Sequence, residues 1–593
     1  MIAVADFLFE ISWEVCNKVG GIYTVVKSKV RPSVERYGSH YFLIGPYFPK
    51  KVQGEFQDKL PPENFKLAFE QLKKEGIVCH FGTWLVPGSP NTILIDFSAF
   101  AQKKDEIKKR LWEVFKIDSY GTQYFDYDEP IVWSVAAGML IENLASEDIK
   151  IVAHCHEWLA GGALLYLKIS GAKVATVFTT HATMLGRTLA SQQINLYSEL
   201  KSIDPEKQAY TYHVATKHQT EKACAQNATV FTTVSEITGL EAEHFFKRKP
   251  DVLTLNGLDL SKFPTFEEST IKHKLFKSKV NEFLIYYFFP YYSFDLDATL
   301  IYFICGRYEF HDKGIDILIK SLGKLNQKLK DEKSEKTVVC FFWIPGNIRG
   351  MKADILESKT FYNDVRESII DSMEDIKNRI TVSLVSQRKI AAETLFDEDT
   401  LDEVERKVLK LKRFGVPALS THDLYNEDTE PILGAFRSCQ LLNKKEDRVK
   451  VVFYPIYLTG ADGMLDLNYY ESMQAGHLGI FPSYYEPWGY TPLEAGALGV
   501  PAVTTDLAGF GRYIKERQKS GQTGIFVLPR FNRTDDETVT DLSNVMYNYA
   551  LLSKQQRVET KIEAKNLAQT ADWKSFIEFY VKAHSLAVER MYK

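Results

Sequence analysis

The sequence predicts an α/β protein made of two doubly wound domains in tandem, and three observations support this fold class. The chain has 593 residues, which is too long for one hydrophobic core. Two separate series of short apolar, β-branched runs alternate with amphipathic or turn-rich segments, as in a mostly parallel sheet flanked by helices. A stretch with helical periodicity interrupts the second series. Because open sheets of this type bind ligands at the carboxyl ends of their strands, two facing sheets would enclose a cleft.

The first series extends from Phe7 to about Asn256 and predicts the strands of a first domain, residues 1–265. Its runs are FLFEIS, YFLIGP, TILIDF, KIVAHC, KVATVFTT and ATVFTTVS. The second series follows the NGLD turn, Asn256 to Asp259, and predicts a second domain, residues 266–573. Its runs are TLIYFICG, TVVCFFWIPG, VKVVFYP, LGIFPS and VPAVTTD.

The interruption lies between Trp343 and Val451 and predicts a helical insertion at about 351–417. Apolar residues recur there at spacings of three and four, which is typical of helices that pack along a stripe: Tyr362, Val365, Ile369, Met373, Ile376 and Ile380, then Leu401, Val404, Val408 and Leu411. We expect a helical hairpin that packs as a coiled coil, within the chain or against another subunit. A simple pair of surface helices remains the alternative.

Composition excludes several classes of function. A net charge of -4 leaves no basic excess for nucleic acid or an acidic membrane. The seven cysteines are odd in number and never spaced as C-x-x-C, so we expect free thiols in a reducing compartment and no zinc framework. The N-terminal stretch lacks the pattern of a signal peptide, and the apolar segment FLIYYFFPYY is too short to span a bilayer. We therefore expect a cytoplasmic protein that binds neither nucleic acid nor membranes.

The stretch SYYEPWGYTPLEAG contains two glutamates, Glu486 and Glu494, eight positions apart. Thr491 as N-cap, Pro492 at the first helical position and Glu494 at the third have the spacing of a capping box. Glu494 is therefore either a structural or a functional residue. Glu486 lies in the loop after a predicted strand, where nothing local requires a carboxylate, and this favours a functional role.

The acid and nucleophile pair of a glycoside hydrolase is a tempting alternative for these two glutamates. Such a pair needs carboxyl groups roughly 5 to 9.5 Å apart. Eight residues of continuous helix would separate them by about 12 Å, and the prolines between them exclude that helix. The amides from Gly489 to Thr491 instead precede a helix whose N-terminal dipole favours a phosphate.

Polar residues also follow other predicted strands. Arg307 and Lys313 occupy the loop GRYEFHDKG and make a plausible diphosphate clamp. In the first domain, His181 and Arg187 follow the run KVATVFTT, although a lone histidine is more often structural.

Two further signals have simple structural explanations. Lys18, Gly20 and Gly21 lie in a turn between a strand and a helix, which lets the backbone approach a phosphate but equally suits a plain turn. The motif HCHEW offers His154 and His156 without other well-placed ligands, so we predict that no metal is bound there.

The segments NKVGGIYTVV, FTTHATMLGR, GRYEFHDKG and PSYYEPWGYTPLEAG together resemble the animal and fungal type of glycogen synthase, a retaining GT-B glycosyltransferase. The resemblance covers almost the whole chain. It implies two Rossmann-like domains facing each other across a cleft, with the C-terminal helix 574–593 crossing back onto the first domain. It also implies transfer of glucose from UDP-glucose to the non-reducing 4-hydroxyl of an α-1,4-glucan such as glycogen, with retention of configuration and without a metal or other cofactor.

Site residues carry over onto matching positions. Glu486 would lie at the transferred glucose, and Glu494 would hold the ribose. Arg307 and Lys313 would neutralise the diphosphate as UDP departs. Tyr469 would stack on uracil. The remaining donor-site residues are Lys18, Gly20 and Gly21 on the phosphate side, His181 and Arg187 from the first domain, and Trp488, Gly489, Tyr490 and Thr491 beside the glutamates.

The resemblance further implies a mechanism. Retention without an obvious nucleophile implies front-face attack on a short-lived ion pair, with the leaving phosphate accepting the acceptor's proton. In this assignment Glu486, His181, Arg307 and Lys313 are the catalytic residues.

The chain departs from the family at the segment QQRVETKIEAKNLAQTADW. Arg557, Lys561 and Lys565 remain from an arginine-rich helix that senses glucose 6-phosphate, but Glu559 and Glu563 dilute their charge. We therefore predict weak or absent activation by glucose 6-phosphate. We also expect a homo-oligomer, a tetramer, while dependence on a glycogenin-like priming protein remains open.

Two alternative functions remain. The first is another retaining GT-B glucosyltransferase that uses ADP-glucose or a small acceptor such as a sugar phosphate. The second is a catalytically silent scaffold that binds glucan. The intact set of Glu486, Arg307, Lys313, His181 and Arg187 argues against the scaffold, because binding alone does not need all of these residues.

Overall fold

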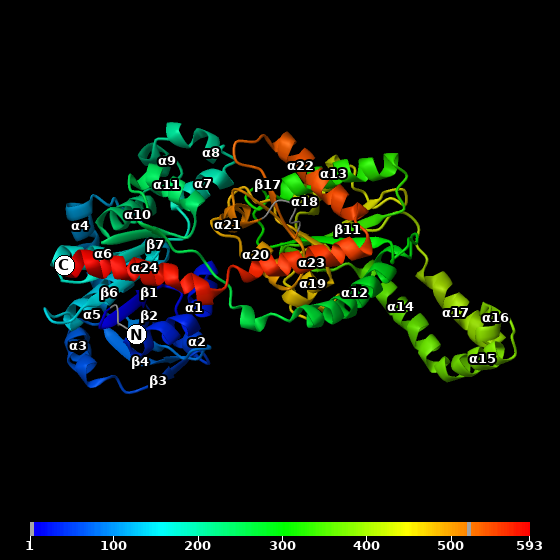
Figure 1. Ribbon diagram of the computed structural model, residues 1–593, viewed down its shortest axis with the longest axis horizontal. Coiled ribbons are helices and arrows are strands. Elements are labelled where there is room, and N and C mark those ends of the chain that lie inside the picture. Colours follow the sequence, from blue (N-terminus) through cyan, green and yellow to red (C-terminus); the bar gives the residue numbers. More distant parts are fainter. Residues whose placement is uncertain (1–4, 519–523) are drawn as a thin grey trace.

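The computed structural model describes residues 5–518 and 524–593, which form two sheets covered by helices (Figure 1). In this part of the chain the larger sheet has nine strands in the order β3-β4-β5-β2-β1-β6-β7-β8-β9. The smaller sheet has six strands in the order β14-β11-β10-β15-β16-β17. The predicted α/β fold class is confirmed.

The nine-stranded sheet belongs to the first half of the chain. Its strands are β1 (Phe7–Ile11), β2 (Tyr41–Pro46), β3 (Phe56–Asp58), β4 (Val78–Trp84), β5 (Asn91–Asp96), β6 (Ile151–His156), β7 (Ala175–Thr180), β8 (Val230–Thr233) and β9 (Val252–Leu253). All six predicted runs are strands. The sequence missed β3 and β4, which pair antiparallel at one edge of the sheet, because β4 is interrupted by polar residues and partly exposed.

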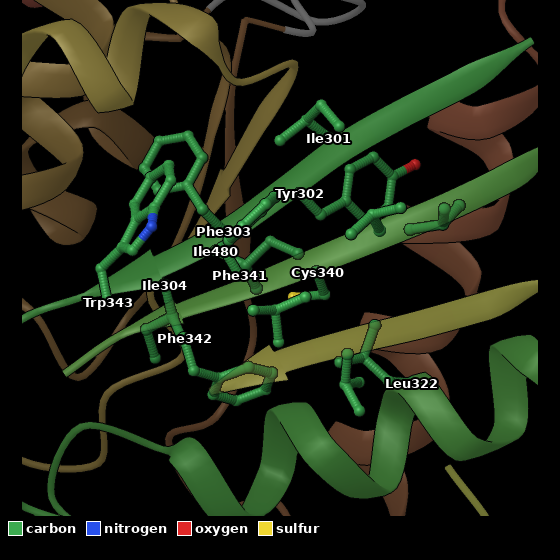
Figure 2. Close-up of a cluster of buried hydrophobic side chains, with 14 of the residues drawn as sticks. Ile301, Tyr302, Phe303, Ile304, Leu322, Cys340, Phe341, Phe342, Trp343 and Ile480 are labelled. Atoms are coloured by element: carbon green, nitrogen blue, oxygen red, sulfur yellow. The ribbon is translucent and has the colours of Figure 1, made fainter. Parts of the chain in front are cut away.

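The six-stranded sheet belongs to the second half. Its strands are β10 (Thr299–Cys305), β11 (Thr337–Trp343), β14 (Val449–Tyr454), β15 (Leu478–Ile480), β16 (Ala502–Thr505) and β17 (Ile525–Leu528). Figure 2 shows side chains of β10 and β11 projecting to both faces of the sheet, among them Ile301, Tyr302, Phe341 and Phe342. Burial on both faces explains why these strands read as unbroken apolar runs.

The helices of the first half cover the nine-stranded sheet. They are α1 (Gly21–Tyr37), α2 (Pro49–Val52), α3 (Glu63–Lys74), α4 (Lys104–Phe115), α5 (Glu129–Leu144), α6 (Gly161–Ser170), α7 (Met184–Ser191), α8 (Leu196–Glu199), α9 (Pro205–Thr211), α10 (Ala215–Asn227) and α11 (Glu236–Phe246). Of these, α1 and α7 begin just after β1 and β7 and carry residues of the predicted site.

The second half begins with the long helix α12 (Phe266–Phe288), capped by Thr265 at the predicted domain boundary. The other helices around the six-stranded sheet are α13 (Ile315–Asp331), α18 (Pro431–Ser438), α19 (Tyr469–Ala475), α20 (Tyr490–Ala497), α21 (Gly509–Arg517), α22 (Asp535–Leu551) and α23 (Lys554–Gln569).

The predicted insertion is helical and projects away from both sheets (Figure 1). It contains α14 (Ala353–Asp371), α15 (Met373–Val385), α16 (Ala392–Leu395) and α17 (Glu398–Leu411), flanked by the short antiparallel strands β12 (Ile348–Met351) and β13 (His422–Leu424). The predicted apolar stripe from Tyr362 to Ile380 is interrupted, because α14 ends at Asp371 and α15 begins at Met373. The apolar stripe therefore belongs to two helices.

The last helix, α24 (Trp573–Tyr592), returns across the chain and packs on the nine-stranded sheet (Figure 1). Its contacts with α1, β7 and β8 agree with the crossing that the resemblance implied. Among the described residues no helix combines the length and apolar character needed to cross a bilayer.

Candidate active site

A pocket of about 440 Å³ opens where the two halves of the chain meet. The turn before α1 forms one side, and the carboxyl ends of β10, β15 and β16 form the other. This is the location expected for a ligand of a doubly wound sheet. Nine of the predicted site residues line it: Gly20, Gly21, Arg307, Lys313, Tyr469, Glu486, Tyr490, Thr491 and Glu494.

Glu486 lies in the loop between β15 and α20 and forms an ion pair with Lys313. Lys313 Nζ lies 2.6 Å from Glu486 Oε2, and each side chain keeps about a fifth of its surface exposed. The loop is held from behind, because Gly509 N donates to Glu486 O at 3.2 Å. The two residues chosen from separate motifs thus form one charged pair in the pocket wall.

Arg307 is a second cation in the lining of the same pocket, in addition to Lys313. Its side chain is 65% exposed and its Nη2 lies 3.1 Å from Glu309 Oε1. Gly314 ends this loop with φ 67°, and a Cβ there would meet Pro482 O at 2.0 Å. Only glycine therefore allows the loop of Arg307 and Lys313 to lie against the loop of Glu486.

Glu494 is a buried residue of the same pocket lining and accepts two hydroxyl hydrogen bonds. Tyr469 OH donates to Oε2 at 3.0 Å and Tyr470 OH to Oε1 at 2.9 Å. Burial raises the pKa of Glu494 to about 7, and the two phenol hydrogen bonds oppose that shift. Tyr470 was missed, although it neighbours the predicted Tyr469.

The predicted capping box is wrong. Helix α20 begins at Tyr490 with Gly489 as its N-cap, and no side chain caps it. Because Gly489 adopts φ 108°, the chain enters the helix before Thr491, which then lies inside the first turn. The structural explanation for Glu494 is therefore removed, and its carboxylate faces the pocket.

Gly20 and Gly21 line the pocket, but a carboxylate of the chain already binds the amides at the start of α1. Gly20 N and Tyr23 N donate to Glu14 Oε2 at 2.6 and 2.9 Å. A Cβ on Gly20 would lie 3.0 Å from Glu14 Oε1. The sequence did not reveal Glu14, and this contact explains Gly20 as part of a turn. Lys18 is exposed nearby, outside the pocket lining.

His181 and Arg187 lie on the first domain, outside the lining of this pocket. His181 is buried at the end of β7; its Nε2 lies 2.9 Å from His156 Nδ1, and its backbone N donates to Glu157 Oε1. Arg187 is exposed on α7. Desolvation lowers the pKa of its guanidinium, but nearby Tyr485, Glu157, Glu309 and Glu486 together raise it above its ordinary value.

The HCHEW motif belongs to a buried network under His181. Donor atoms of Glu10, His154 and His156 lie within 4.8 Å of one another, an arrangement that could hold a metal ion. However, Lys29 Nζ lies 2.5 Å from Glu10 Oε1 and balances its charge, while His156 Nε2 lies 2.7 Å from the same oxygen. The Lys29 ammonium thus supplies the positive charge that a metal ion would bring to Glu10. The predicted absence of a metal stays a prediction.

The ring of Trp488 is not in the pocket. It is 3% exposed and packs among Phe510, Tyr513 and Phe576. An aromatic residue between two pocket glutamates was expected to reach the donor, but it supports the loop from the core side. Nine lining residues were not predicted, and none of them carries a charge: Val19, Thr24, Ile304, Cys305, Gly306, Phe481, Ser483, Pro492 and Thr504.

The helix that carries the expected sugar-phosphate cations is α23. Burial, together with the positive charges of Arg557 and Lys277, lowers the pKa of Lys561 to about 8. Lys565 Nζ instead donates to Ala497 O at 2.9 Å. Glu559 is exposed on the same helix. The weak response to glucose 6-phosphate stays a prediction.

Comparison with known proteins identifies the family. The model of the family described as glycogen synthase matches residues 10–593. The liver glycogen [starch] synthase of Mus musculus is 36% identical over 591 residues, covering 99% of this chain and 84% of the relative. The glycogen [starch] synthase of Caenorhabditis elegans is 38% identical over 596 residues, covering 99% of this chain and 88% of the relative.

Among solved structures, the catalytic domain of Starch Synthase IV from Arabidopsis thaliana bound to ADP and acarbose has a TM-score of 0.50 at 14% identity. The match covers 98% of this chain and 100% of that one, and it shows the fold. The resemblance noted in the sequence is thus confirmed: the chain belongs to the glycogen synthase family and is a glycosyltransferase with the GT-B fold.

Proposed function

We propose that this protein transfers glucose from UDP-glucose to the non-reducing 4-hydroxyl of an α-1,4-glucan, with retention of configuration and without a metal ion. The observation that carries the proposal is the Lys313–Glu486 ion pair beside Arg307 in a pocket formed by both halves of the chain. The printed names of the relatives support glycogen as the product. The match of the motifs to the animal and fungal type supports UDP-glucose as the donor.

In this proposal the pocket residues bind successive parts of the donor. Tyr469 offers a ring to the base and Glu494 a carboxylate to the ribose hydroxyls. Arg307 and Lys313 lie where the diphosphate would follow. Because two side-chain cations can balance this charge, the proposal needs no divalent ion.

The chemical step follows from the charges. As the bond from the glucose anomeric carbon to the β-phosphate oxygen breaks, negative charge grows on UDP and positive charge on the sugar ring. Arg307 and Lys313 stabilise the first, and the Glu486 carboxylate stabilises the second. The acceptor's 4-hydroxyl oxygen bonds to the same face of the anomeric carbon, and its proton passes to the leaving phosphate. Configuration is thereby retained.

Incorporation of labelled glucose into glycogen tests the proposal. We expect incorporation from UDP-glucose, a loss of at least about a hundredfold in Glu486→Gln, and no loss in the surface control Glu589→Gln. ADP-glucose and glucose 6-phosphate are supplied in parallel reactions, and EDTA in another.

Three outcomes contradict separate parts of the proposal. Incorporation from ADP-glucose alone contradicts the donor, inhibition by EDTA contradicts metal independence, and a trapped covalent glucosyl–Glu486 adduct contradicts front-face transfer. If neither donor gives incorporation, the proposed activity is contradicted, and a transferase with a small acceptor or a catalytically silent scaffold becomes the better explanation.

A further inference from the structure

Two tyrosines directly precede Glu486, and both reach across to the first half of the chain. Tyr485 is 4% exposed and lies in the hydrophobic cluster of the first domain, with Leu185 and Tyr197. Tyr484 OH donates to Ile194 O at 3.3 Å. The residue before the pocket glutamate is thus anchored in the opposite domain.

The polar end of Tyr485 meets a buried carboxylate on α11. Tyr485 OH lies 3.1 Å from Glu241 Oε2 and 3.3 Å from Thr183 O. A phenol has one hydrogen to donate, and the distance to the Glu241 carboxylate is the shorter of the two. Glu241 is therefore the main acceptor of this hydrogen bond.

Glu241 also accepts two hydrogen bonds from its own domain. Thr183 Oγ1 donates to Oε2 at 2.6 Å and Tyr197 OH donates to Oε1 at 2.9 Å. Both partners lie in the first half of the chain, so these two bonds need nothing from the second domain. The bond from Tyr485 is the one that links the two halves through this carboxylate.

The same carboxylate controls the position of the first-domain site loop. Thr183 follows His181 by two residues, and its Oγ1 accepts from Gly186 N as the N-cap of α7, which carries Arg187. Glu241 thus binds the loop of His181 on one side and the loop of Glu486 on the other.

We propose that Tyr485 and Glu241 are positioning residues that set the distance between Glu486 and the loop of His181. Neither residue lines the pocket, and in this proposal both act through the residues beside them. This inference rests on the proposed transferase function, because it assigns Glu486 and His181 to one reaction.

The test compares two phenols that bind the same carboxylate. Tyr485→Phe removes the hydrogen bond between the domains, and Tyr197→Phe removes one inside the first domain. We expect kcat to fall about tenfold in Tyr485→Phe, with KM for UDP-glucose changed by less than about twofold, because the loss affects alignment and not donor contacts. Tyr197→Phe should keep kcat within about twofold of the wild type.

Glu241→Gln extends the comparison. The amide keeps the shape of the carboxylate, and we expect a loss of kcat similar to that of Tyr485→Phe. The double variant Tyr485→Phe/Glu241→Gln should lose little more than either single variant, because both changes remove one interaction. Equal loss of kcat in Tyr197→Phe and Tyr485→Phe would overturn the proposal, as would full activity of Tyr485→Phe or additive losses in the double variant.

Small-angle scattering gives a readout that does not depend on turnover. A larger radius of gyration is expected for Tyr485→Phe than for the wild type and for Tyr197→Phe, with and without UDP, because the domains are less firmly joined. Identical radii in all three proteins contradict the positioning role. If the wild type transfers glucose to no acceptor, the proposed function is refuted. If the difference in radius of gyration between the variants is still found, the link between the domains stands independently of that function.

Discussion

Single charged side chains in the pocket owe their properties to their partners. Glu486 is paired with Lys313 at 2.6 Å, whereas Glu494 is held by two phenols and has no cation among the groups that shift its pKa. Two glutamates eight positions apart thus have different environments and, in the proposed reaction, different tasks.

The environment of Glu494 predicts a pH dependence of donor binding. Because burial raises its pKa to about 7, Glu494 is largely protonated at pH 6 and ionised at pH 8. The ionised form is the better acceptor for ribose hydroxyls, so we expect KM for UDP-glucose to fall as pH rises through about 7. Initial rates measured between pH 6 and 8 give this profile.

Glu494→Gln is the matched variant for this prediction. It should raise KM by about tenfold at pH 8 and remove the change with pH, because the amide does not titrate. A pH profile that persists unchanged in Glu494→Gln would assign the titration to another group.

At the scale of elements, the helical insertion exposes apolar side chains. Val382, Leu384 and Val385 of α15 are 58%, 62% and 81% exposed, and Leu409 of α17 is 67% exposed. Within the chain, α14 packs against α17 and the base of α14 packs on α12, where Tyr362 contacts Tyr286. These exposed side chains of α15 and α17 form an apolar surface, called the tip here, that no described residue covers.

We propose that a second copy of the chain covers this tip, as the expected oligomer requires. The double variant Leu384→Lys/Val385→Lys should lower the mass measured by light scattering, because it places charges in the contact. Lys410→Ala on the neighbouring α17 is the control and should leave the mass unchanged. A mass that is identical in all three proteins would exclude this surface as the contact.

At the scale of the whole molecule, α24 joins the end of the chain to its beginning. Trp573 is 1% exposed, its Nε1 donates to Ser28 Oγ at 2.7 Å, and a Cβ on Gly257 would lie 2.8 Å from it. Further along α24, His584 Nε2 lies 3.0 Å from His154 Nδ1 under the nine-stranded sheet.

We predict that Trp573→Ala lowers the free energy of unfolding by about 3–5 kcal/mol, because it leaves a cavity where α24 meets the first domain. Lys582→Ala on the exposed side of the same helix should change it by less than about 0.5 kcal/mol. Urea denaturation of both variants measures the difference. A loss below about 1 kcal/mol in Trp573→Ala would show that the helix end is not part of the cooperative unit.

Much of the fold was predictable because its signals are local. Buried parallel strands read as apolar runs, and all of the runs that were singled out are strands. The missed strands have weaker signals: β4 is interrupted by polar residues and only partly buried, and β17 is a run of only four residues. The break between α14 and α15 was missed because an apolar stripe continues through it.

The candidate site was predictable where a charge follows a strand and has no local partner. Glu486 and Lys313 meet this condition, whereas Arg307 has the local partner Glu309, and all three line one pocket. The ring of Trp488 was expected at the donor but packs in the core, whereas Gly20 lines the pocket and its amide donates to the Glu14 carboxylate. The core packing of Trp488 and the contact of Gly20 with Glu14 cannot be read from the residues next to them in the sequence.

The sequence by itself determined which segments are strands and helices and which loops carry charge, because periodicity and strand ends depend on neighbouring residues. Only the tertiary structure decided which charges are paired. Lys313 and Glu486 are 173 positions apart, and Tyr485 and Glu241 are 244 apart, yet each pair is in hydrogen-bond contact. Such contacts arise when packed sheets and helices bring distant loops together, and burial then sets the strength of each interaction.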